Sequence, residues 1–211
     1  YLIMQRYSAT GRLEPGRDIE SLIQTAIMSR YTDQEARLLE TLCILESFTL
    51  PQALYVTGDA AAPGIIQRLS AGNSFIRYDE RADNYHLHNI FSNYLKKRLA
   101  EQGDSAELKK LYKRSGQWYI ESGDIFSGLS FFLKAEEYDL ILTAFEKHGA
   151  TTELDKAPGL IVEIFSQIPE EVKYRHPIGY ITYAYNYLVC VDMEGGAALL
   201  AQIEEHYRHD A

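Results

Sequence analysis

Apolar residues in the first part of the chain recur at the spacing of an α-helix in several separate runs. Thr32-Asp33-Gln34-Glu35 predicts a capping box, in which the threonine hydroxyl and the glutamate carboxylate each accept a hydrogen bond from the other residue's backbone amide. Thr49 with Gln52 repeats this pattern, and Pro63 marks a further helix that ends at Gly72-Asn73. The predicted helices carry Ile19, Leu22, Ile23, Ala26 and Ile27, then Leu38, Leu42 and Leu45, then Ile65, Ile66 and Leu69.

The spacing changes to strand-like alternation between residues 74 and 88. Residues 74–78 and 85–87 flank the polar segment 79–84, which predicts a two-stranded hairpin. After Asn89 the apolar residues return to helical spacing, at Phe91, Tyr94, Leu95 and Leu99. His88 therefore lies at the seam between a strand and a helix. Helices, then a short hairpin, then a closing helix to about Gln102 are the order of elements in a winged-helix domain.

From Ser105 onward the pattern is helical throughout, so this half is predicted to be all-α. Residues 119–124 followed by Gly128 are echoed by residues 188–193 followed by Ala197, an offset of 69 residues. That offset is about twice the roughly 34 residues of a tetratricopeptide repeat. Small residues at Gly128 and Ala197 would let paired helices approach closely. Helix pairs that cannot bury their apolar faces alone stack into a solenoid.

The predicted fold class is mainly α, with a winged-helix domain that contains a small β-hairpin and then an all-α, tetratricopeptide-like arm. We assign residues 1–17 to the tail of a preceding module and a linker, 18–103 to the winged-helix domain, and 104–211 to the start of the arm. Because the sequence begins at Tyr1 rather than Met, we expect a piece of a longer protein.

Composition narrows the function classes. The chain has 211 residues and a formal net charge of −9, which disfavours a nucleic-acid surface. No signal peptide and no apolar run of membrane-spanning length is visible, so we expect a cytoplasmic location without membrane contact. Cys43 and Cys190, the two cysteines, stand in apolar helical context and are expected to be free thiols in a reducing compartment.

Two motifs offer candidate chemistry and both lack essential parts. Residues 11–18 have the glycine spacing of a P-loop, but Arg17 and Asp18 replace the lysine and hydroxyl residue that bind phosphate and magnesium. His86 and His88 would share one face of a strand at a spacing that can chelate zinc, yet nothing nearby in the sequence completes a tetrahedral set. We therefore expect no catalytic residue, no metal and no bound cofactor in this chain.

The residues around the seam resemble a known family. Leu87-His88-Asn89, preceded by Tyr85 and followed by Phe91 and Leu95, is similar to the histidine motif that closes the winged-helix domain of STAND signalling ATPases, and in particular of MalT-like regulators of the LuxR class. Family members usually read Met-His-Asp, so this chain departs at Asn89. A segment at 168–177 also resembles the start of the repeats in the helical arm of such proteins.

This resemblance implies a role for the chain. His88 would contact the phosphates of ADP held by a separate, upstream nucleotide-binding domain of the same protein, and so favour a closed state. ATP or ADP would belong to that domain. A downstream sensor would bind an inducer, and a LuxR-type helix-turn-helix would bind DNA. The chain itself would couple nucleotide state and inducer sensing to DNA-binding activity without catalysing a reaction.

Alternative interpretations accompany each of these assignments. His88 could instead cap the helix or pack in the core. Tyr180, Tyr183 and Tyr187 could form a partner-binding surface, although packing between repeats is the interpretation we prefer. Residues 61–71 occupy the place of a recognition helix but offer little beyond Gln67 and Arg68 to contact DNA, so we expect no direct DNA binding. The rival function is a tetratricopeptide-like protein-interaction scaffold with no link to nucleotide.

Overall fold

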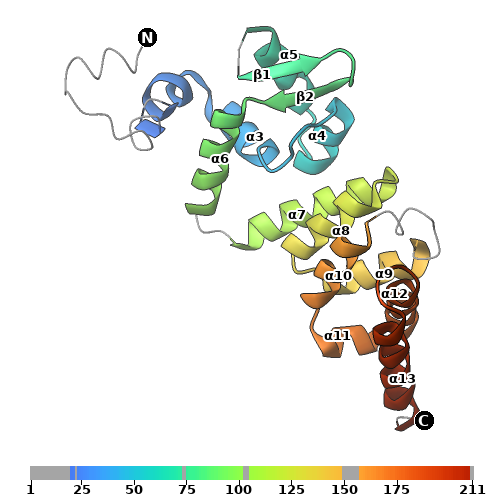
Figure 1. The fold of residues 1–211 in the computed structure, drawn as a ribbon. Helices are drawn as coiled ribbons and strands as arrows, with labels where there is room; N and C mark the ends of the chain where they lie inside the picture. The colour runs from blue at the N-terminus through green and yellow to red at the C-terminus, as the bar shows by residue number, and fades with distance from the viewer. Residues whose placement is uncertain (1–19, 22, 73–74, 102–104, 149–156, 210–211) are drawn as a thin grey trace, which may run out of the picture. The chain divides into compact units, whose positions relative to one another are not determined.

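A computed structural model of the chain describes residues 20–209 except 22, 73–74, 102–104 and 149–156 (Figure 1). The chain divides into two compact units, Tyr1–Asp104 and Ser105–Ala211. The first contains the β-hairpin and the second is helical wherever its structure is described, so the fold is a winged-helix unit followed by a helical arm. The predicted linker and the P-loop-like segment 11–18 lie outside the described residues. None of the described helices is both long and apolar enough to cross a membrane.

The winged-helix unit begins with a π-helical segment, η1 (Ile23–Ile27), and a 3₁₀ turn, η2 (Met28–Arg30). Three α-helices follow: α3 (Asp33–Leu42), α4 (Leu50–Thr57) and α5 (Ala62–Gly72). The predicted regular helix over the first apolar run is therefore replaced from Ile23 to Arg30 by a π-helical segment and a 3₁₀ turn.

Side-chain caps define where α3 and α4 start. The Thr32 hydroxyl accepts a hydrogen bond from the Glu35 amide, and the Glu35 carboxylate accepts one from the Thr32 amide at 2.8 Å, which confirms the predicted capping box. Thr49 accepts a hydrogen bond from the amide of Gln52 at 3.3 Å. These bonds satisfy amides that have no partner inside the helix, and each such cap contributes about 1 kcal/mol.

The hairpin joins β1 (Ile76–Asp79) to β2 (Asn84–Leu87) in antiparallel register, with Ile76 opposite Leu87. Tyr85 also exchanges two backbone hydrogen bonds with Phe48, at 2.8 and 2.9 Å, so the hairpin is tied to the α3–α4 connection. The helix α6 (Asn89–Glu101) follows. Tyr85 and Leu87 point into a core whose fully buried members include Leu39, Leu42, Leu45, Phe48, Ile66, Ile76, Phe91 and Leu95.

The arm contains seven described helices: α7 (Ser105–Glu121), α8 (Ile125–Lys134), α9 (Tyr138–His148), α10 (Pro158–Ser166), α11 (Glu170–Arg175), α12 (Pro177–Cys190) and α13 (Met193–His209). One apolar core runs through it from Ile125 to Ile203. The pairs α7–α8 and α12–α13 are the most extensively packed neighbours (Figure 1).

These two pairs are built alike, at an offset of 68 residues. Asp124 caps α8 and Asp192 caps α13, each accepting a hydrogen bond from the amide three residues later. A Cβ on Gly128 would lie 2.6 Å from the Ile120 side chain, and one on Gly196 would lie 2.3 Å from the Cα of Leu188. The offset is thus twice a period of about 34 residues.

One detail of the sequence prediction is wrong. Ala197, which was expected to permit close approach of the second pair, is exposed, and Gly196 lies at the crossing instead. Gly128 does lie at the corresponding crossing of the first pair.

We expect Gly196→Ala to lower the free energy of unfolding of the arm by about 1–3 kcal/mol, because its methyl group would overlap the backbone of Leu188. The matched control is Gly159→Ala on α10, where a Cβ meets nothing within 4 Å; this change should be neutral or slightly stabilising. Urea unfolding followed by the fluorescence of Trp118, on α7, measures both. Equal midpoints for Gly196→Ala and wild type would show that the close crossing is absent.

Candidate functional site

The backbone of His88 joins the hairpin to α6. Its N–H donates a hydrogen bond to the carbonyl of Phe75 at 2.8 Å, and its carbonyl accepts one from the amide of Ser92 at 2.9 Å. The first bond extends the pairing of β1 and β2 by one residue, and the second is the first hydrogen bond of the helix. Both backbone groups of His88 are therefore satisfied, which holds this residue where the strand ends.

The imidazole of His88 is neither sealed in the core nor free in solvent. The residue is half-buried, and its ring meets the Phe75 ring edge-on, with centroids 6.4 Å apart at 84°. Its Nδ1 atom is buried without a hydrogen-bond partner among the described residues. A buried ring nitrogen without a hydrogen bond is energetically unfavourable, and histidines with a purely structural role normally avoid it.

Phe75, which contacts the His88 ring, belongs to an aromatic cluster. Phe91 is fully buried and packs against Phe75 at 5.3 Å and Tyr31 at 6.2 Å between centroids. Tyr31 and Phe75 also border a cleft of about 340 Å³, whose other lining residues are Ile27, Arg30, Glu35, Arg68, Leu69 and Gly72. Since Phe91 lies in the first turn of α6, which His88 precedes, His88 stands between two packed elements.

The cleft contains an ion pair that fixes the candidate recognition helix. Arg68 of α5 donates a hydrogen bond to Glu35 at 2.7 Å, while the second carboxylate oxygen of Glu35 serves the capping box of α3. The Arg68 contact, followed by the Thr32 amide, lowers the pKa of Glu35 below its usual value. Arg68 is one of the two side chains of α5 that could read DNA, and it is occupied in holding α3.

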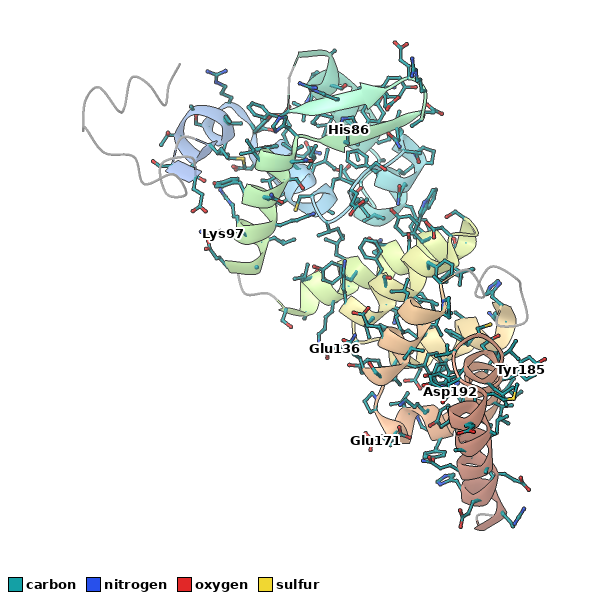
Figure 2. All side chains as sticks on the ribbon, viewed as in Figure 1. His86, Lys97, Glu136, Glu171, Tyr185 and Asp192 are labelled. Carbon is teal, nitrogen blue, oxygen red and sulfur yellow. The ribbon has the colours of Figure 1, made fainter. Side chains whose placement is uncertain are left out.

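Basic residues elsewhere are also matched by acidic ones. Lys97 on α6, labelled in Figure 2, bonds to Glu20 at 2.8 Å. Lys113 on α7 bonds to Glu137 at 2.8 Å. Lys109 pairs with Glu136 at 2.5 Å. Such pairs are typical of solvated helix faces, and a lysine that is paired with a carboxylate is less available to bind a phosphate.

The paired histidines do not form a metal site with their neighbours. His86 lies on β2 opposite Arg77 (Figure 2), whereas His88 follows the end of the strand. Across the described part of the chain, no three His, Cys, Asp or Glu side chains are grouped so that they could hold a metal ion.

The tyrosines proposed as a partner surface lie mostly inside the arm. Tyr180 is 2% exposed and Tyr183 is 8% exposed, and Tyr183 stacks on Phe165 with ring centroids 3.8 Å apart. Burial raises the pKa of Tyr183 to about 12. Tyr187 is half-buried and packs against Tyr183. Tyr180 and Tyr183 are therefore packing residues, and Tyr185, which was not singled out from the sequence, is the exposed tyrosine of this helix at 60%.

The helices, the hairpin and α6, with His88 between the hairpin and α6, have the order of a winged helix. Residues 23–107 match the family model of the MalT winged helix domain. This part of the chain is accordingly a MalT-like winged-helix region. No curated protein matches the chain.

We expect Glu35→Gln to destabilise the winged-helix unit by about 1–2 kcal/mol at pH 7, because it weakens one ion pair and one cap. The folded pKa of Glu35 is lowered, so this stabilisation is present above the unfolded pKa of about 4.3 and is lost as the pH falls through the folded pKa. Urea unfolding monitored by circular dichroism across this pH range should show the two proteins converge in acid. Glu46→Gln, an exposed change on the α3–α4 connection, is the control and should match wild type throughout. A constant difference between Glu35→Gln and wild type at all pH values would contradict the assignment.

Proposed function

We propose that this chain is a non-catalytic regulatory segment of a STAND-type, LuxR-class bacterial transcription regulator, in which it couples nucleotide state and inducer sensing to DNA binding. The observation that carries the proposal is the placement of His88: a half-buried histidine, whose main chain is held by two hydrogen bonds, in a region that matches the MalT winged helix domain. The upstream nucleotide-binding domain, the inducer sensor and the DNA-binding domain belong to the proposal and lie outside residues 1–211.

The role proposed for His88 is a contact with the phosphates of ADP in the neighbouring domain. Nε2, the ring nitrogen other than the buried Nδ1, can donate a hydrogen bond to a phosphate oxygen, and a bond to such an ionised acceptor is stronger than one between neutral groups. The buried Nδ1 and the Phe75 ring restrict the ring's orientation, so little freedom would be lost on contact. A ligand contact that exists in the closed state alone shifts the population toward that state.

A scaffold function remains the second candidate, and one observation favours it. The helix α12 exposes several large apolar side chains, which is typical of a protein-binding surface. The two functions differ in what precedes Tyr1 in the encoding gene: a glycine-rich Lys-Ser/Thr loop supports the regulator, and further helical repeats support the scaffold.

We expect His88→Ala in the intact protein to release ADP roughly tenfold to a hundredfold faster and to raise basal transcription, since a hydrogen bond to a charged group contributes about 1.5–3 kcal/mol. ADP retention after gel filtration and reporter expression without inducer measure the two effects. His86→Ala, two residues away on β2, is the matched control and should leave both unchanged. Wild-type ADP retention and basal expression in His88→Ala would remove the switch role from this residue.

A direct DNA-binding role would predict that the isolated chain shifts duplex DNA in a gel. We expect no gel shift of duplex DNA by residues 1–211 even at about 50 mM salt, where phosphate contacts are much stronger than at physiological salt. A salt-sensitive shift would contradict this expectation, and its loss in Arg68→Ala would assign it to α5.

A further inference from the structure

His176 joins two helices of the arm. Its backbone N–H donates a hydrogen bond to the carbonyl of Lys173 at 3.1 Å, where α11 ends, and its carbonyl accepts one from the amide of Tyr180 at 2.9 Å, where α12 begins. The residue belongs to the segment 168–177, which resembles the start of the repeats in a helical arm. The function proposed above gives the side chain of this residue no role.

Both nitrogens of the His176 ring face carboxylates of α9. Nε2 lies 2.9 Å from Oδ1 of Asp139, and Nδ1 lies 3.4 Å from Oε1 of Glu146. Two helical turns separate these residues, so both carboxylates project from the same side of α9. The side chain of His176 is 21% exposed, so most of its surface is withdrawn from water.

The main chains of α9 and α12 are in close contact at this place. A Cβ on Gly179 would lie 2.7 Å from the carbonyl oxygen of Leu142. Gly179 lies three residues after His176 on α12, and Leu142 lies between Asp139 and Glu146 on α9. The ring of His176 therefore bridges two carboxylates where α12 packs on α9 (Figure 1).

A neutral imidazole cannot donate to both carboxylates. It has one N–H donor, and its other nitrogen carries a lone pair. That lone pair would face a carboxylate oxygen, and the two would repel each other. The imidazolium carries an N–H on each nitrogen and can donate to both oxygens, through hydrogen bonds that its charge strengthens. The contacts of His176 with α9 are therefore complete only while the ring is protonated.

The other charges around the ring oppose its protonation only in part. Arg175 donates to both oxygens of Asp139, at 2.8 and 3.0 Å, and the N-terminus of α12 adds about half a positive charge. Lys173 of α11 bonds to Glu170 at 2.8 Å, and α12 itself carries no Asp, Glu, Lys or Arg. Two carboxylates against one guanidinium and one helix terminus leave an excess of roughly half a negative charge.

The Asp139 carboxylate stays ionised throughout the range in which histidines titrate. Its contact with His176, followed by its contact with Arg175, lowers the pKa of Asp139 below its usual value. Between about pH 5.5 and pH 8 the ring of His176 is therefore the group of this cluster that is expected to change charge.

We propose that His176 forms a pH-dependent clamp with Asp139 and Glu146, in which the imidazolium holds α12 on α9 and loss of its proton weakens this junction. The stabilisation is present below the unfolded pKa of a histidine, about 6.5, and is lost as the pH rises above the neutral range. The clamp lies within the arm, so it is independent of the contact proposed for His88.

Urea unfolding of residues 1–211, followed by the fluorescence of Trp118 on α7, tests the clamp. His176→Gln keeps an amide donor at this position but cannot become charged. The ratio of the folding equilibrium constants of wild type and His176→Gln should fall by roughly twofold to tenfold between about pH 5.5 and pH 8, as expected for two partly exposed ion pairs. A ratio that is the same at all pH values overturns the proposal.

A second variant tests the bridge without removing the histidine. Glu146→Gln places an amide N–H beside Nδ1, from which a neutral ring can accept a hydrogen bond, so the stability of the arm should depend less on pH than in wild type. Its circular dichroism spectrum should match that of wild type. A wild-type pH profile in Glu146→Gln overturns the bridge.

The matched control is His86→Gln, which removes a histidine from β2 in the winged-helix unit. The fluorescence of Trp118 reports on the arm, so this variant should keep the wild-type profile. A profile in His86→Gln as flat as that of His176→Gln overturns the assignment of the pH dependence to His176.

Discussion

Two backbone hydrogen bonds of His88 hold in place the residue that we propose contacts the nucleotide phosphate. The amide of His88 completes the hairpin by bonding to Phe75, and its carbonyl starts α6 by bonding to Ser92. The main chain of His88 is therefore held on both sides. Asn89 stands where proteins with the similar histidine motif usually have Asp. The junction between the hairpin and α6 therefore forms without that carboxylate.

The packing around the seam transmits this constraint to the rest of the winged helix. Phe91 lies one turn into α6 and contacts both Phe75 and Tyr31, so movement of α6 would disturb the start of the hairpin and the turn before α3 together. The Glu35–Arg68 pair links α3 to α5 across the adjacent cleft. A contact made by His88 would therefore act on a packed unit, which is what a coupling role demands.

Much of the fold was predictable because short-range chemistry specifies it. The capping box at Thr32, the hairpin, the seam at His88 and the helical arm each follow from residues within a few positions of one another. The repeat was placed one residue out because it was aligned on apolar residues; aligning the capping aspartates, Asp124 and Asp192, gives 68 and puts Gly196 at the crossing. The π-helical turn at Ile23–Ile27 could not be predicted, since its apolar spacing resembles that of an α-helix.

The spacing of residues along the sequence could not show which aromatic and histidine rings are buried. Tyr183 and Tyr187 share a helix face, but only the packed structure shows that this face meets Phe165, and that Tyr185 lies on the open side. The same holds for His88, whose Nδ1 is buried and whose ring meets Phe75, thirteen positions earlier in the chain.

We propose that the imidazole of His88 meets a phosphate of a nucleotide bound by a neighbouring domain. A structure of the full-length protein with ADP bound tests it most directly, through the distance from Nε2 of His88 to the nearest phosphate oxygen. We expect a hydrogen bond of about 2.7–3.2 Å. A bound ADP whose phosphates are held by other groups, with the imidazole of His88 facing solvent, would contradict it.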